Sequence, residues 1–196
     1  MDKPRKVIKK ELVVKDKYTS YHKYHYTDTK EEKVLECEVI GREVAGNPMS
    51  SIIIPICKSV KLNGPHVILI VSYRIPVESW VLEFPSGNND GEDIVGCAIR
   101  ELKEETGYVG EPRKDKMFGV LTDPWKSNEN TAFVLVDVDL DSELNTNPKQ
   151  NLESDEHIQI LIPPLRGLKQ EIKKLMAGGN MKVCWNLWLF AEGLDL

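Results

Sequence analysis

The sequence predicts an α/β (α+β) fold, in which a mixed β-sheet has helices on both of its faces. Strand-like segments come first along the chain, one helical segment stands in the middle, and more helical segments come near the end. Because strands and helices do not alternate, a doubly wound parallel sheet is not expected. Hydrophobic residues make up 41% and charged residues 29% of the 196 residues, which is typical of one folded domain, with room for a small appendage.

Several segments have the composition of strands, because β-branched and apolar residues cluster in them between turn residues. They span residues 34–44, 51–57, 67–73, 80–84, 117–121, 131–140 and 157–162. The tripeptide Asn63-Gly64-Pro65 is a turn between two of these strands, and Pro85-Ser86-Gly87 stops the strand at 80–84. Together these strands supply the expected sheet.

The clearest helix is expected at residues 91–106, where apolar residues recur every fourth position and form one core-facing side. Asp90 is placed to cap its start, and Gly107 is placed to end it as a left-handed C-cap. A second amphipathic helix is expected at 165–176. The segment 183–193 is apolar nearly all round, which predicts a buried helix.

Residues 1–48 are expected to form an N-terminal strand or arm segment in front of a main domain of residues 49–196. The first 30 residues are polar and basic, and they contain the closely spaced tyrosines Tyr18, Tyr21, Tyr24 and Tyr26. Such a cluster offers aromatic faces for stacking. Packing at a sheet edge, or an arm without fixed structure, is the alternative explanation.

The charge balance argues against some classes of partner. Lys and Arg number 26, and Asp and Glu number 31, so the formal net charge is −5. No nucleic-acid partner is expected, because binding of nucleic acid usually needs a basic face. No membrane partner is expected either, because the longest apolar runs are far below the roughly 20 residues of a membrane span.

The N-terminus is charged and no apolar stretch follows it, which argues against a secretory signal. The cysteines Cys37, Cys57, Cys97 and Cys184 form no Cys-x-x-Cys pair, which argues against a zinc or redox site. We therefore expect a cytoplasmic chain with free thiols, and the nucleus is a second compartment that fits.

Three acids gather in the last two turns of the helix at 91–106: Glu101, Glu104 and Glu105. The C-terminal end of a helix carries partial negative charge, and like charges three or four residues apart repel each other by about 0.2–0.5 kcal/mol per pair. Arg100 and Lys103 offset part of this repulsion, but they are expected to project from different faces. A bound divalent cation would remove the conflict, and oxygen ligands suit Mg²⁺ or Mn²⁺. A solvated acidic helix face is the alternative.

The acids belong to a longer string, Gly87-x4-Glu92-x7-Arg100-Glu101-Leu102-x-Glu104-Glu105-x-Gly107-Tyr108. This string resembles the Nudix box, G-x5-E-x7-R-E-U-x-E-E-x-G-U, where U is an aliphatic or bulky apolar residue. The loop between Gly87 and Glu92 is one residue shorter than the family pattern, and Tyr108 fills the last apolar position. The acids themselves are all present.

The resemblance implies a Nudix-type α/β/α sandwich that hydrolyses a nucleoside diphosphate linked to another group. It also implies a site for Mg²⁺, with Mn²⁺ as the other candidate, formed by Glu101, Glu104 and Glu105 and by the backbone carbonyl of Ser86. Glu92 either assists this site from the start of the helix or only pairs with Arg100. Metal ions there would bridge the diphosphate oxygens and lower the pKa of a bound water.

Residues around the box narrow the resemblance. Arg74-Ile75-Pro76 and Leu82-Glu83-Phe84-Pro85-Ser86-Gly87 resemble the ADP-ribose and ADP-sugar pyrophosphatases. This implies a homodimer that cleaves ADP-ribose to AMP and ribose 5-phosphate. Other nucleoside-diphosphate compounds, such as a UDP-sugar or an oxidised nucleotide, are alternative substrates. A Nudix module that only binds nucleotides is a further alternative, although the intact acids argue against it.

The same resemblance implies roles for single residues. Glu156, in the acidic loop before the last strand, is the expected general base, and Glu153 is the alternative. Glu104 and Glu105 complete the catalytic set. The expected substrate-binding residues are Arg74, Glu36, Tyr18 and Asp123. An arginine can grip a phosphate with its planar fork, although a surface arginine at a strand end explains Arg74 as well.

Overall fold

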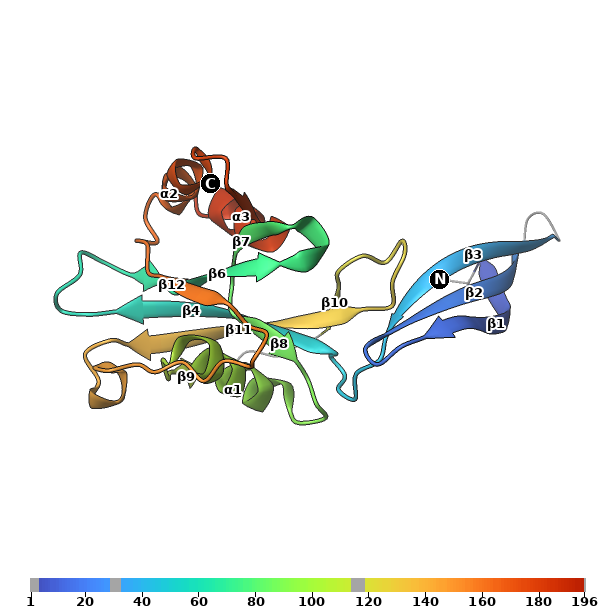
Figure 1. Ribbon diagram of the computed structural model, residues 1–196, viewed down its shortest axis with the longest axis horizontal. Coiled ribbons are helices and arrows are strands. Elements are labelled where there is room, and N and C mark those ends of the chain that lie inside the picture. The colour runs from blue at the N-terminus through green and yellow to red at the C-terminus, as the bar shows by residue number, and fades with distance from the viewer. Residues whose placement is uncertain (1–3, 29–32, 114–118, 196) are drawn as a thin grey trace.

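The computed structural model describes residues 4–28, 33–113 and 119–195 of the chain. Its first sheet is antiparallel and three-stranded, in the order β1 (Arg5–Lys15), β2 (Thr19–Asp28) and β3 (Val34–Arg42). It lies at one end of the molecule, beside the layered remainder of the chain (Figure 1). Strand β1 is exposed along its whole length. For the segment before residue 30 the sequence predicted only a strand or an arm. The described residues of this segment form two long strands.

The second sheet is mixed. Its strands are β4 (Ser50–Lys58), β5 (His66–Val67), β8 (Ser86–Asn88), β9 (Glu111–Pro112), β10 (Val120–Leu121) and β11 (Asn130–Asp139). The main order is β10-β11-β4-β5, and the long strands β4 and β11 run parallel to each other. Strand β8 pairs with β4 and thereby places Ser86 beside Ile52. The strand expected at 117–121 is seen as β10, whereas residues 117 and 118 lie outside the described residues.

The third sheet is also mixed, in the order β12 (Ile158–Leu161), β6 (Leu69–Arg74), β7 (Ser79–Glu83) and β13 (Met181–Val183). Strands β7 and β13 are parallel, and the other two pairings are antiparallel. The short 3₁₀ turns η1 (Ile75–Val77) and η2 (Glu143–Asn145) complete the elements. Parallel and antiparallel pairs together confirm the mixed sheet that the sequence predicted.

Helix α1 (Ile94–Thr106) lies on one side of these sheets, and α2 (Leu168–Met176) and α3 (Trp185–Gly193) lie on the other (Figure 1). Strand β4 contributes to the core on both sides. Ile53 packs in a cluster with Leu102 of α1, whereas Ile54 packs in a second cluster with Ile172 of α2 and Leu187 of α3. Burial of both faces explains why β4 is apolar almost without interruption. The expected α/β/α sandwich is confirmed.

Helix α1 begins later than expected. Its N-cap is Asp93, whose carboxylate accepts hydrogen bonds of 3.1 and 3.0 Å from the backbone N–H groups of Val95 and Gly96. The prediction of Asp90 as the cap was therefore wrong, because residues before Asp93 form a turn in which Gly91 has φ +102°. The C-cap is Gly107 at φ +74°, as predicted.

The C-terminal segment also differs from expectation. Residues 181–183 are the strand β13, and the helix α3 begins only at Trp185. Side chains of α3 are not buried all round, since Trp185 is 52% and Leu189 is 58% exposed. The prediction of a buried helix was wrong because the helix packs only one side, with Leu187 and Ala191, against the core. No helix in the described part of the chain combines the length and the apolar character of a membrane span.

Candidate active site

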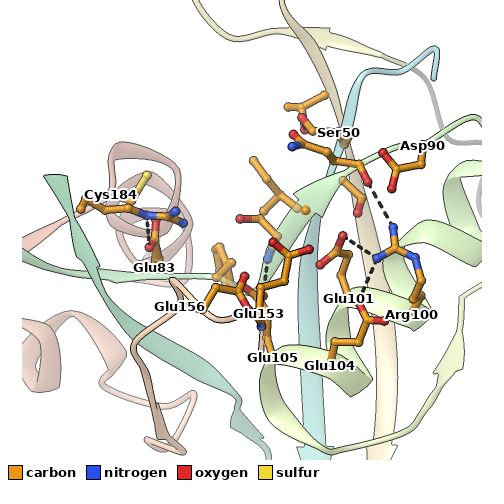
Figure 2. Close-up of a pocket in the computed structure, with 18 of the residues that line it drawn as sticks. Ser50, Glu83, Asp90, Arg100, Glu101, Glu104, Glu105, Glu153, Glu156 and Cys184 are labelled. Atoms are coloured by element: carbon orange, nitrogen blue, oxygen red, sulfur yellow. Dashed lines mark hydrogen bonds and ion pairs between the residues drawn. The ribbon is translucent and has the colours of Figure 1, made fainter. Parts of the chain in front are cut away.

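A cavity of about 990 Å³ lies between helix α1, the strands β7 and β8, the loop before β12 and the segment that leads into α3. The turn between β1 and β2 reaches it as well, through Tyr18 and Thr19. Acidic side chains from α1 and from the loop before β12 project toward the same space (Figure 2). Arg42 and Arg74 also line the cavity, so both signs of charge face it.

Three carboxylates of α1 line this cavity, because residues spaced by three and four positions share one side of a helix. Glu105 is buried, with 3% exposure, and its Oε2 accepts a hydrogen bond of 2.8 Å from the backbone N–H of Ser86. The side chains of Glu101 and Glu104 are 13% and 37% exposed. The sequence-predicted acids thus meet Ser86 in one place.

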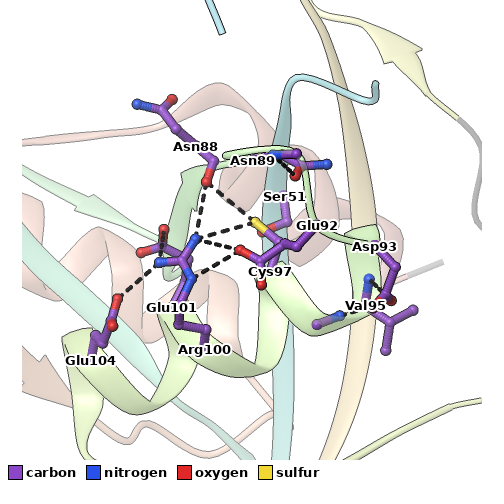
Figure 3. Close-up of polar contacts among 12 residues, drawn as sticks. Ser51, Asn88, Asn89, Glu92, Asp93, Val95, Cys97, Arg100, Glu101 and Glu104 are labelled. Atoms are coloured by element: carbon purple, nitrogen blue, oxygen red, sulfur yellow. Dashed lines mark hydrogen bonds and ion pairs between the residues drawn. The ribbon is translucent and has the colours of Figure 1, made fainter. Parts of the chain in front are cut away.

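Arg100 is held among these acids (Figure 3). Its Nη1 donates to Glu101 over 2.8 Å and to Glu104 over 2.9 Å. Its Nε and Nη2 donate to Oε1 of Glu92 over 2.9 and 2.8 Å. The expectation that Arg100 projects from a different face was wrong, because its long side chain reaches the residue four positions later. Glu92 is seen in the role of ion-pair partner.

The pKa values of two of these acids, Glu101 and Glu105, are raised. Burial raises the pKa of Glu101 to about 7, although the charge of Arg100 opposes that rise. Burial likewise raises the pKa of Glu105 well above its usual range, against the hydrogen bond from Ser86 and together with the charges of Glu101 and Glu156. Buried carboxylates resist ionisation until a positive charge joins them. A bound cation would therefore stabilise the ionised forms of Glu101 and Glu105.

The loop before β12 brings two further acids to the cavity, Glu153 and Glu156 (Figure 2). The two residues close a small turn: the backbone N–H of Glu156 donates to the carbonyl of Glu153 over 3.1 Å. In return, the carboxylate of Glu156 accepts the backbone N–H of Glu153 over 2.8 Å. The carboxylate of Glu156 is near enough to Glu101 and Glu105 to raise the pKa of both.

The opposite wall carries an ion pair in which Glu83 is buried and Arg74 is partly exposed. Nε of Arg74 donates to Oε1 of Glu83 over 2.8 Å, and Glu83 is 8% exposed. Burial raises the pKa of Glu83, and Arg74 counteracts this shift. Cys184 and Asn186, from the start of α3, line the cavity on the same side. With Nε bound to Glu83, the terminal nitrogens of Arg74 are the donors that can meet an anion in the cavity.

Comparison with known families agrees with this geometry. A model of the NUDIX domain matches residues 56–176, which is more than half of the chain. This chain belongs to the Nudix family. An uncharacterised Nudix hydrolase of Schizosaccharomyces pombe is 33% identical over 180 residues, covering 91% of this chain and 86% of that protein.

Other relatives carry more specific names. The ADP-sugar pyrophosphatase of Mus musculus is 31% identical over 192 residues, covering 97% of this chain and 86% of that protein. The ADP-ribose pyrophosphatase of Saccharomyces cerevisiae is 40% identical over 111 residues, covering 56% and 48% of the two chains. The crystal structure of an ADP compounds hydrolase superposes with a TM-score of 0.63 at 19% identity, over 87% of this chain and 84% of that one. At this identity the structural likeness shows a shared fold.

Nudix hydrolases generally need a divalent metal ion, and the residues of this site fit one. The donors are carboxylate oxygens, which such cations prefer. A Cβ on Gly87 would overlap the carboxyl group of Glu101, so this glycine makes the room in which that acid lies. Within residues 4–28, 33–113 and 119–195, no three side chains of Asp, Glu, His or Cys lie close enough together to hold a metal ion as they stand. Arg100 donates a hydrogen bond to one carboxylate oxygen of Glu101 and to one of Glu104.

Two predicted residues of this Nudix chain do not line the cavity. Glu36 lies on β3, where its carboxylate is 3.2 Å from Nδ1 of His25 and 3.6 Å from Nζ of Lys23. Asp123 lies in the turn after β10, where its carbonyl accepts the backbone N–H groups of Lys126 and Ser127. Neither residue is part of the cavity lining, so their contact with substrate stays a prediction.

The structure also brings residues to the cavity that the sequence did not single out. Arg42 ends β3, donates to Oδ1 of Asn88 over 2.6 Å and lies 3.2 Å from the carboxylate of Glu129. No motif in the sequence marks Arg42 as functional. Glu83 did carry a signal, because an acid between the apolar residues of a short buried strand needs a partner.

Proposed function

We propose that this Nudix protein hydrolyses the diphosphate of a nucleoside diphosphate sugar, with ADP-ribose as the substrate, and releases AMP and ribose 5-phosphate. The observation that carries the proposal is one cavity in which the acids of α1 face Arg74. Such a cavity offers oxygen ligands to a cation at one wall and a phosphate-binding fork at the other. The names of the mouse and yeast relatives support an ADP-linked substrate.

Mg²⁺ is the proposed metal, and Mn²⁺ is the substitute. Glu101, Glu104, Glu105 and the carbonyl of Ser86 would hold it. When bound, it would neutralise charge on the diphosphate oxygens and favour ionisation of a water. Its binding would require that Glu101 and Glu105 lose their protons and that Arg100 release the oxygens of Glu101 and Glu104 that it holds. The metal affinity is therefore expected to rise with pH near neutrality.

Glu156 is the proposed general base. Its carboxylate takes a proton from the attacking water, the water oxygen bonds to one phosphorus, and the bridging oxygen leaves with the other phosphate. The acids of α1 would be committed to the metal, whereas Glu156 accepts the backbone N–H of Glu153 and is carried by a loop. A loop carboxylate can approach the water after the substrate has entered, which limits chemistry without substrate.

Substrate binding is assigned to Arg74 at the diphosphate and to Tyr18 at the base. Tyr18 is 55% exposed in the cavity wall, and the ammonium of Lys17 lies 4.5 Å from the centre of its ring. We assign Glu36 and Asp123 to contacts that form when a second copy of the chain joins the first. The N-terminal sheet supports this homodimer, because its strand β1 exposes Leu12 and neighbouring valines. The cytoplasm is the proposed compartment, with the nucleus as the other.

A panel of nucleotide sugars tests the function. The purified chain is incubated with ADP-ribose, ADP-glucose, UDP-glucose and an oxidised nucleoside triphosphate, with Mg²⁺ or with EDTA, and the products are separated by chromatography. We expect AMP from ADP-ribose only with the metal. Turnover of UDP-glucose alone would move the substrate class away from adenine nucleotides. Binding of ADP-ribose without any product would identify a nucleotide-binding module instead.

A further inference from the structure

The loop of residues 151–157 carries Glu153 and Glu156. Its stem, which consists of Gln150 and Asn151, is bound to the end of helix α1. The last four carbonyl groups of any α-helix have no partner within the helix, and those of Glu104 and Glu105 belong to this set. The backbone N–H of Asn151 donates to the carbonyl of Glu104 over 2.8 Å. The loop thus begins at a fixed point on the helix that carries the acids.

Gln150 adds the contact that closes the stem. Its Nε2 donates to the carbonyl of Glu105 over 2.7 Å and to the carbonyl of Ile158 over 3.3 Å. Both partners accept hydrogen bonds, so the amide nitrogen and not the amide oxygen must lie between them. One side chain therefore joins the helix, the start of the loop and the first residue of β12.

A glycine allows this close approach. Gly107 has φ +74°, and a Cβ at this position would overlap the backbone of Lys149. The chain just before Gln150 therefore packs directly on the end of α1. The stem contacts span 45 to 47 positions in sequence between helix and loop, so they exist only in the folded chain.

We infer that Gln150 is a positioning residue for Glu156: by joining both ends of the 151–157 loop to helix α1, it holds the loop carboxylate at a set place relative to Glu101 and Glu105. This inference rests on the proposed role of Glu156. Precise placement matters because a shift of about 1 Å in a catalytic group costs up to about 10²-fold in rate.

Three variants test the inference. Gln150→Leu keeps the size of the side chain and removes both donors. Gln150→Lys restores a donor, and its positive charge suits the C-terminal end of a helix. Gln159→Leu is the matched control, because Gln159 is exposed on β12. Measurements are kcat and KM for ADP-ribose, the melting temperature, and deuterium uptake of the peptides that cover residues 151–157 and helix α1.

We expect Gln150→Leu to lower kcat about tenfold and to leave KM within about twofold, because the loop is displaced while the binding groups stay in place. Uptake should be faster in residues 151–157 and unchanged in α1. Gln150→Lys should recover most of kcat, and Gln159→Leu should match the wild type. A kcat loss that comes with faster exchange throughout α1 would mean a structural role only, and so overturn the inference.

Unchanged kcat in Gln150→Leu would also overturn it, whether or not the loop exchanges faster, and so would a Lys variant no better than Leu. If the wild type itself hydrolyses no nucleoside diphosphate sugar, the proposed function fails. Deuterium uptake of Gln150→Leu then tests separately whether Gln150 anchors the loop. Faster uptake confined to residues 151–157 would support this anchoring, and unchanged uptake would contradict it.

Discussion

The backbone N–H of Ser86 donates a hydrogen bond of 2.8 Å to the buried carboxylate of Glu105. Ser86 is the first residue of β8 and Glu105 lies in the last turns of α1, so the bond joins this strand to the helix. The bond holds one carboxylate oxygen of Glu105 in place, and both residues line the cavity.

Glu105→Gln and Glu104→Gln should each lower kcat by about 10²-fold or more at saturating Mg²⁺, because each removes a charged ligand while the volume is kept. Circular dichroism should show an unchanged fold. Glu143→Gln, at an exposed position outside the cavity, serves as the control. Wild-type turnover in both cavity variants would contradict the assignment of these acids.

The metal-free protein should lose stability as pH rises from about 4.5 to 7. The pKa of Glu101 is raised from 4.5 to about 7, so within this window the folded chain keeps a proton that the unfolded chain has released. The free energy of unfolding then falls as pH rises. Melting temperatures of wild type and Glu101→Gln, measured in EDTA across this range, should diverge in favour of the variant. Parallel curves would show that Glu101 does not titrate in this window.

Glu156→Gln should lower kcat by about 10²–10⁴-fold, the usual contribution of general-base catalysis, with little change in KM. The amide oxygen of the variant can still accept the backbone N–H of Glu153, so the loop should keep its turn. Glu153→Gln is the matched control on the same loop and should be mild. The reverse ranking of the two variants would make Glu153 the base, and two silent variants would place the base on α1.

Arg74→Lys should raise KM for ADP-ribose about tenfold and affect kcat less, because lysine cannot offer a planar fork to a phosphate while also binding Glu83. Initial-rate kinetics measure both constants. Arg113→Lys is the control, since Arg113 pairs with exposed Asp137 away from the cavity. An unchanged KM would assign Arg74 a purely structural pairing with Glu83.

The chain should sediment as a homodimer at micromolar concentration, and the double variant Leu12→Thr/Val13→Thr should weaken the dimer. Leu12 and Val13 are both 53% exposed on β1, and threonine keeps the strand preference while it reduces apolar surface. Val60→Thr, at a valine that is 91% exposed in the connection after β4, should leave association unchanged. A monomeric wild type would remove the proposed role of the N-terminal sheet.

The sequence by itself determined the elements whose signals are local. The period of a helix places Glu101, Glu104 and Glu105 on one side wherever the helix lies, and a glycine at position 107 ends it in the left-handed region. Runs of β-branched residues likewise predicted β4, β6 and β11 to within a few residues. These features depend on neighbours in the chain, which the sequence shows directly.

Only the tertiary structure decided which groups meet across the chain. The contact of Gln150 with Glu105, the contact of Arg42 with Asn88 and the place of Tyr18 in the cavity wall join positions far apart in sequence. Such contacts follow from strand register and from how sheets and helices pack, and a shift of one residue in register would turn each side chain to the opposite face. Residue spacing along the chain does not determine these distances, because they depend on how the elements pack in the folded molecule.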